Sequence, residues 1–306
     1  MAVPHASENF GDLLDPRFQD IYNDRLAQLE DKVSTLFSFE SATKTTEDMR
    51  FSQVGTLDDW DAFTGAVDYD SIFQGYDVTT TPVEFTKGVQ VKRKLFDDGM
   101  YHFMDQKPKA MATSYNRTRQ KHAARLFTMA FSTDPFFYSH SEGVALCSNS
   151  HTTTSGASTA SGFDNLGTAA LSAVSVAAAR IQMRGFRGDR AERIHVMPNE
   201  LWHPPDLYEI AQEINQSSGK LDVANNNINV HQGQYTLHDW EYMSNTKDWF
   251  MADSVGRTDN LKWWDRVPVE FAHVEDFDTL IAKWRGYARY SWLYIDWRWV
   301  MGHNVA

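Results

Sequence analysis

Eleven histidines and one cysteine are the residues of this chain that could bind a metal ion or act as a nucleophile. No two histidines are four residues apart, and none form a His-x-His pair, so the common zinc spacings are missing. Cys147 stands beside a Ser/Thr-rich stretch, with His140 and His151 nearby in sequence. Proximity in sequence does not make a catalytic triad, so we interpret Cys147 as a small buried hydrophobe. The sequence predicts no catalytic residue, no metal site and no cofactor.

Two short glycine motifs also have a possible chemical meaning. Arg187-Gly188-Asp189 spells an integrin-binding tripeptide, and Gly185 to Gly188 could be mistaken for part of a phosphate-binding loop. The tripeptide matches often by chance, and phosphate loops carry more glycines and open a helix. We therefore interpret this stretch as the end of a helix followed by a turn.

Most of the ten tryptophans lie in the second half of the chain, among several aspartates. Exposed tryptophans and a pair of carboxylates would suit a carbohydrate-active enzyme, with Trp263 and Trp264 as stacking residues. Most of these tryptophans occur in strand-like patterns, which favours burial in a core or an interface. The enzyme remains an alternative, and its candidate acids are Asp253, Asp265, Asp278 and Asp296.

A basic segment is the remaining candidate for binding chemistry. Between residues 106 and 133 there are six Lys or Arg and no Asp or Glu, in a chain of net charge −12. Arg117, Lys121 and Arg125 form one row at helical spacing. This row is either a solvated or intersubunit face, or an inner face that meets nucleic acid loosely through phosphates. The sequence leaves both interpretations open.

The row requires a long helix to carry it. Apolar residues recur at helical spacing from about Pro108 to Ser132, with Asp105 as the predicted N-cap and Pro108 in the first turn. Asp134-Pro135 is expected to end the region. The residues of the apolar stripe are Met111, Tyr115, His122, Leu126 and Met129.

The segment before this helix has the alternation of a half-buried strand. Val83, Phe85, Val89 and Val91 fall on one face, and polar residues fall on the other. Pro82 favours an edge strand. We predict an extended hairpin over residues 51–96, in which 51–63 is the first limb, 64–75 the tip and the alternating strand the return limb.

The other elements are predicted from shorter signals. A helix opening at Asp15-Pro16 has a narrow apolar stripe, so residues 1–50 are expected to pack on something else. Residues 148–162 read as a loop, and strand-like segments end in one aromatic run over 289–303. Between them we predict helices at 167–184 and 206–215 and a strand at 194–197.

Composition places the chain among folded proteins. Its 306 residues are 42% hydrophobic and 23% charged, enough to bury a core in one or two domains. No apolar run approaches the roughly 18 residues that span a membrane, and the first ten residues lack the pattern of a signal peptide. A single cysteine is consistent with a reducing compartment.

The order of these elements resembles the Hong Kong 97 fold of tailed-phage major capsid proteins. The resemblance rests on residues 76–99, 115–132, 171–189 and 194–214, and it consists of patterns and their order rather than of an invariant signature. It covers most of the chain and implies an α+β fold. The implied parts are an N-terminal arm (1–50), an extended loop (51–96), a peripheral domain with the spine helix (97–164), an axial domain (165–270) and returning C-terminal strands (271–306).

The resemblance also implies a function. Subunits would assemble as pentamers and hexamers into an icosahedral head around the double-stranded DNA of a tailed phage, after synthesis in the host cytoplasm. Phe73, Tyr76 and Lys87 are the candidate intersubunit residues of the extended loop. Some family members crosslink a loop lysine to a neighbour, but no local pattern marks Lys87 for this reaction.

The implied partners are further copies of the chain, a separate scaffolding protein, a portal and a decoration protein. A separate scaffold is expected because the stretch before the hairpin is short for a cleaved scaffolding segment. The acidic balance implies that packaged DNA is held loosely, and no membrane partner is expected. An encapsulin-like shell with a protein cargo is the alternative that keeps the fold.

Overall fold

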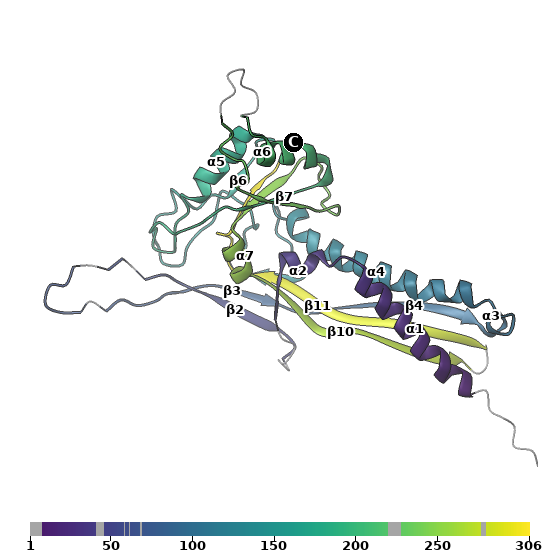
Figure 1. Ribbon diagram of the computed structural model, residues 1–306. Helices are drawn as coiled ribbons and strands as arrows, with labels where there is room; N and C mark the ends of the chain where they lie inside the picture. Colours follow the sequence, from purple (N-terminus) through teal and green to yellow (C-terminus); the bar gives the residue numbers. More distant parts are fainter. Residues whose placement is uncertain are drawn as a thin grey trace, which may run out of the picture.

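The part of the chain that the structure describes combines helices with three β-sheets (Figure 1), so the predicted α+β class is confirmed. The computed structural model describes residues 8–40, 46–57, 59–60, 62–67, 69–219, 228–276 and 280–306. The predictions for residues 1–7 and for Asp278 lie outside this part of the chain. The elements are α1 Glu8–Gln28, α2 Lys32–Leu36, β1 Ser38–Glu40, β2 Met49–Val54, β3 Gln74–Thr80, β4 Val83–Lys92, α3 Arg93–Asp97, α4 Tyr101–Thr128, β5 Tyr138–His140, β6 Leu166–Gly167, α5 Ala173–Met183, β7 Glu200–His203, η1 Pro205–Leu207, α6 Tyr208–Gln216, β8 Thr236–Asp239, β9 Trp249–Ala252, α7 Ser254–Asn260, β10 Leu261–Asp276, β11 Ile281–Tyr294 and β12 Val300–His303.

A long, narrow sheet forms one arm of the molecule. Its strand order is β1-β10-β11-β4, and β10 and β11 form an antiparallel hairpin along its length. Helices α4 and α1 lie along this sheet in Figure 1. Strand β4 is an edge strand, and its side chains alternate between half-buried or buried and exposed over most of its length. The predicted alternation and the edge position after Pro82 are both confirmed.

The return limb of the predicted hairpin is divided between two sheets, which corrects the prediction that one strand continues through it. Residues 74–80 pair with β2, whereas residues 83–92 pair with β11. The division occurs at Thr81 and Pro82, where the chain leaves one sheet for the other. Because β4 and β11 are almost 200 residues apart, no local pattern could have assigned this pairing.

The spine helix α4 is longer than predicted. It begins at Tyr101 after the N-cap Met100, and Pro108 lies inside it. Asp105 is therefore not the cap. Its carboxylate instead accepts a hydrogen bond from Arg17 of α1 at 2.7 Å. Met111 and Leu126 are buried as predicted.

Helix α1 packs on the arm of its own chain. The Phe18 ring lies 4.8 Å from the Trp284 ring, and the Tyr22 ring lies 5.2 Å from the Phe271 ring. Both Phe18 and Tyr22 are buried, so the narrow apolar stripe is covered without a neighbouring subunit. The helix starts at Glu8 and not at Asp15-Pro16.

A five-stranded sheet of order β6-β12-β9-β7-β8 is the centre of a second region, together with α5 and α6. Helices α5 and α6 confirm the two predicted helices. Residues 194–197 are not a strand, because the strand in this stretch begins at Glu200. The final aromatic run is also not a single strand, since β11 ends at Tyr294 and β12 begins at Val300.

Tryptophans fill the core of both regions. Of the ten in the chain, all except Trp60 are at most 3% exposed. In the arm, Trp263 lies against Tyr290 with ring centroids 5.0 Å apart. The second region stacks the Trp202 ring on His238 at 4.0 Å. The tryptophans in the strand patterns are therefore core residues and do not form a surface platform for sugars.

Candidate assembly interface

A long loop projects from the body of the molecule between β2 and β3 (Figure 1). The two strands pair from Met49↔Thr80 to Val54↔Gln74, and the described residues between them, 55–57, 59–60, 62–67 and 69–73, form the loop. Its described apolar side chains are exposed, and Trp60 is 98% exposed. An exposed group of large apolar side chains marks an interaction site, because a soluble chain otherwise buries them. The exposed residues are Leu57, Trp60, Phe63, Val67, Tyr69, Ile72 and Phe73.

Phe73 and Tyr76 lie where this loop joins the body. The carbonyl of Phe73 accepts a hydrogen bond from the Gly55 amide at 2.9 Å, which closes the loop. A Cβ at Gly55 would be only 2.7 Å from that carbonyl, so the close approach requires glycine. Tyr76 is half-buried in β3, and its hydroxyl hydrogen-bonds the Thr152 hydroxyl at 2.5 Å. Both predicted residues thus lie at the return root of the loop, three residues apart in the chain, each with a different partner.

Lys87, the third predicted residue of this set, lies elsewhere. It is exposed on β4, opposite Gly286 of β11, in the arm sheet. The loop and Lys87 therefore belong to different sheets. A joint role for the three residues stays a prediction, and in one subunit the structure does not group them.

The basic row on α4 is also divided. Arg125 is half-buried, donates hydrogen bonds to both carboxylate oxygens of Asp134, at 2.5 and 2.8 Å, and covers the Phe136 ring. Lys121 is exposed, with its ammonium 5.8 Å from the Tyr242 ring. Arg117 is exposed and, among the described residues, has no side-chain partner. Arg125 is thus engaged within the chain, whereas Lys121 and Arg117 are exposed to solvent.

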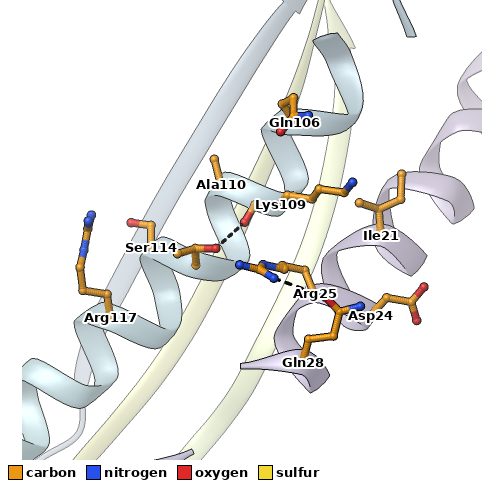
Figure 2. Close-up of a pocket in the computed structure, with 10 residues that line it drawn as sticks. Ile21, Asp24, Arg25, Gln28, Gln106, Lys109, Ala110, Ser114 and Arg117 are labelled. Carbon is orange, nitrogen blue, oxygen red and sulfur yellow. Dashed lines mark hydrogen bonds between the residues drawn. The ribbon is translucent and has the colours of Figure 1, made fainter. Parts of the chain in front are cut away.

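Arg117 lines a groove of about 750 Å³ between α1 and α4. Figure 2 shows Lys109 of α4 and Arg25 of α1 pointing into the space between the two helices. Arg117 points away from α1 in this view, and Asp24 is the acid of the lining. Three cations against one carboxylate make this an electropositive surface in a chain of net charge −12.

Cys147, Trp263 and Trp264, which the sequence raised as candidates for enzymatic chemistry, are buried in the core. Cys147 is buried, and burial raises the pKa of its thiol, which disfavours the thiolate needed by a nucleophile. His151 does not face it but contacts Glu142 and Asn165. Trp263 and Trp264 are both fully buried, so they cannot stack on a sugar. Within the described residues, no group of three or more His, Cys, Asp or Glu is arranged to hold a metal ion.

Sequence reasoning missed the contacts that hold the projecting loop. Arg190 lies in the turn after the Arg-Gly-Asp tripeptide, and its guanidinium hydrogen-bonds Asp70 and Ser71 of the loop at 2.6 Å. The charged character of this turn was visible in the sequence. Its partner was not, because Asp70 is 120 residues away.

Comparison with solved structures finds the same fold in particles of several origins. The chain matches the capsid of an empty GTA particle with a TM-score of 0.55 and 11% identity, covering 90% of each chain. It matches Microbacterium phage Oxtober96 with a TM-score of 0.54 and 9% identity, covering 91% of this chain and 92% of that one. For the procapsid of bacteriophage JBD30 the TM-score is 0.54 and the identity 13%, with 98% and 76% covered. The fold is therefore of the Hong Kong 97 type.

The family described as phage capsid protein matches residues 75–301. This chain therefore belongs to the phage capsid protein family, and it is a major capsid protein of the phage head shell. A comparison with curated proteins finds no match. The family match favours the phage head over an encapsulin-like compartment. Among the described residues, no helix is long and apolar enough to cross a membrane.

Proposed function

We propose that this subunit assembles through its projecting loop, as pentamers and hexamers, into an icosahedral head around the double-stranded DNA of a tailed phage. The observation that carries the proposal is the group of exposed apolar residues on a loop that leaves the body of a phage capsid protein. Such a loop has no apolar surface of its own to cover it, and a neighbouring copy would supply one. Covering large aromatic side chains such as Trp60 would contribute about 1.5–3 kcal/mol for each one buried.

The proposal includes the virion as the location of the protein, with synthesis in the host cytoplasm. A separate scaffolding protein, a portal and a decoration protein are its proposed partners. A closed shell uses one surface for several symmetric contacts, so a scaffold would select the correct curvature among them. The family match and the shell-forming neighbours support this set of partners as a proposal.

We propose that the basic groove and the exposed end of the α4 row meet packaged DNA loosely. Arg117 and Lys121 are exposed cations, and Arg25 and Lys109 point into the groove. A few phosphate contacts of this kind would be weak and salt-sensitive. The overall charge of −12 opposes tight wrapping of DNA. Strong binding of DNA by isolated subunits at physiological salt would contradict this part of the proposal.

Negative-stain electron microscopy of the purified protein, combined with light scattering on the same sample, tests the assembly. Uniform closed shells tens of nanometres across, or rings of five or six subunits, are the expected result. The same sample should be tested with a scaffold candidate from the neighbouring genes. Subunits that remain monomers or dimers with that scaffold present would contradict the proposed function.

A further inference from the structure

The turn at residues 187–193, called the bracket below, is tied to both limbs of the projecting loop at their roots. On the return limb, Arg190 donates hydrogen bonds to the Asp70 carboxylate and to the Ser71 carbonyl, both at 2.6 Å. Its guanidinium also lies 5.2 Å from the centre of the Phe73 ring. On the outgoing limb, the Thr56 hydroxyl donates to the Glu192 carboxylate. One short turn thus holds both sides of the loop.

The ion pair within this contact is sheltered from solvent. The Arg190 side chain is 15% exposed and that of Asp70 is 32% exposed. Exposed ion pairs contribute little to stability because water and salt screen them. The Arg190 guanidinium donates to a carboxylate and a carbonyl through one nitrogen, Nη2, and lies over an aromatic ring, so this ion pair is stronger and more directional than an exposed one. The contact can therefore fix an angle as well as a position.

The bracket is closed by hydrogen bonds between its own residues. The Gly188 amide donates to the Glu192 carbonyl at 2.8 Å, and the Arg190 amide donates to the Glu192 carboxylate at 2.9 Å. A Cβ at Gly188 would overlap that carboxylate and would displace it, so glycine leaves room for the Glu192 side chain in this position. Ala191 has a φ of 66°, a left-handed conformation that only a well-determined surrounding maintains in alanine.

The bracket is also anchored to the body of the subunit. Arg298 donates to the Arg187 carbonyl at 2.7 Å and to the Asp189 carboxylate at 3.0 Å. The Asp189 carbonyl accepts a hydrogen bond from the Thr153 hydroxyl at 2.9 Å. The Arg187 side chain donates to the Ala191 carbonyl at 2.5 Å. The Arg-Gly-Asp tripeptide is thus occupied by contacts within its own chain.

We propose that the bracket sets the direction in which the projecting loop leaves the subunit, with Arg190 as its main positioning residue. Beyond Gly55 and Phe73 the described residues of the loop have no strand pairing, so the loop direction depends on its roots. The bracket aims the exposed aromatic residues at the surface of the neighbouring copy. This inference rests on the proposed function, because it takes that copy as the target of the loop.

The first test measures the loop roots in the isolated subunit and does not depend on assembly. Hydrogen–deuterium exchange of the Gly55 amide reports the bond to the Phe73 carbonyl that closes the loop. Arg190→Ala should accelerate this exchange roughly tenfold, which corresponds to about 1.4 kcal/mol. Arg190→Lys keeps the charge and loses the planar guanidinium that lies over Phe73, so an intermediate rate is expected.

Arg193→Ala is the matched control, because Arg193 belongs to the same turn and its exposed side chain has no partner among the described residues. It should leave the Gly55 exchange unchanged. Asp70→Asn probes the same contact from the loop side, and it covers the case in which Arg190→Ala fails to fold. If Arg190→Ala folds and its Gly55 amide exchanges at the wild-type rate, the inference is overturned. If Arg190→Ala does not fold, a wild-type exchange rate in Asp70→Asn overturns it instead.

The second test compares shells by electron microscopy. Folded Arg190→Ala subunits should give few closed shells or misshapen ones, whereas Arg193→Ala should give normal shells. Normal shells from Arg190→Ala would show that the bracket does not direct assembly. If wild-type subunits form no shells even with a scaffold, the proposed function fails, and the exchange experiment still decides whether the bracket holds the loop.

Discussion

The buried carboxylate of Glu200 forms an ion pair with Arg257 that links separate elements of the fold. Arg257 donates to its two oxygens at 2.8 and 2.9 Å, and donates a third hydrogen bond to the Leu36 carbonyl at 2.5 Å. Burial alone would raise the pKa of Glu200, but the nearby His238, these bonds and the arginine charge outweigh burial and lower this pKa to about 2. The pair joins β7, α7 and the end of α2, so its role is structural.

A buried histidine, His303, and a half-buried one, His122, predict how stability depends on pH. Burial lowers the pKa of His303 to about 4, and burial together with Arg125 lowers that of His122 to about 4. Between pH 6.5 and 4 the unfolded chain binds protons that these folded-state rings do not bind. The free energy of unfolding should therefore be highest above pH 6.5 and should fall as the pH drops towards 4. At pH 5 it should be lower by about 2 kcal/mol for each histidine.

Denaturant unfolding of wild type and His303→Gln at pH 7 and pH 5 tests this prediction. His303 is stacked on Trp249 at 3.9 Å and is 4% exposed. Glutamine does not titrate, so the difference in unfolding free energy between the two pH values should shrink by about 2 kcal/mol in the variant. His195→Gln, at an exposed position, is the control. An unchanged difference in His303→Gln would show that the ring takes up its proton in the folded state.

At the scale of single residues, the sequence correctly predicted burial where burial follows from a local pattern. Cys147 is a buried hydrophobe as predicted, and Trp263 and Trp264 are buried in strands. Arg125 could not be assigned, because its helical spacing does not reveal that Asp134 would bind it after the helix ends. Arg190 could not be assigned either, since its partner becomes a neighbour only when the whole chain folds.

At the scale of elements, prediction succeeds where the period of the sequence matches the burial of one element. Strand β4 and the core-facing Met111 and Leu126 of α4 were found in this way. The start of α4 was missed because Pro108 and Asp105 look like a helix start. In the structure Asp105 binds Arg17 of α1, a contact that a local pattern cannot reveal.

Helix α4 should tolerate no charge on its buried face. Leu126 is 2% exposed within the main core. Leu126→Asp would bury an unpaired carboxylate and should destabilise the fold by more than about 4 kcal/mol. Soluble expression and circular dichroism measure the result, which should be insoluble or unfolded protein. Thr113→Asp changes an exposed residue of the same helix and should remain folded. A soluble, native-like Leu126→Asp would contradict the orientation of α4.

At the scale of the whole molecule, the order of the elements was predictable from the sequence and their pairing was not. The arm joins β1, β4, β10 and β11, which come from the beginning, the first third and the end of the chain. The resemblance implied only that the C-terminal strands return to the peripheral domain, and it placed residues 83–92 of β4 in the extended loop rather than in this sheet. The division of the chain into an N-terminal arm (1–50), an extended loop (51–96), a peripheral domain (97–164), an axial domain (165–270) and C-terminal strands (271–306) remains a proposal.

The projecting loop should be dispensable for folding and required for shells. Replacing residues 59–69 with a short Gly-Ser linker keeps Gly55, Thr56, Asp70 and Phe73 at the loop root. Trp60 is 98% exposed, so its loss removes no core packing. The melting temperature should stay within about 2 °C of wild type, since surface changes usually cost less than about 0.5 kcal/mol. Electron microscopy should show no closed shells.

A second variant separates the length of the loop from its apolar side chains. Trp60→Ser, Phe63→Ser and Tyr69→Ser together keep the full length and remove three exposed aromatic rings. If these rings are buried against a neighbouring copy, this variant should also fail to form shells, because each contact loses about 1.5–3 kcal/mol and a shell repeats it in every subunit. Normal shells from the triple variant would mean that the loop acts through its backbone. An unfolded linker variant would mean instead that residues 59–69 are part of the fold.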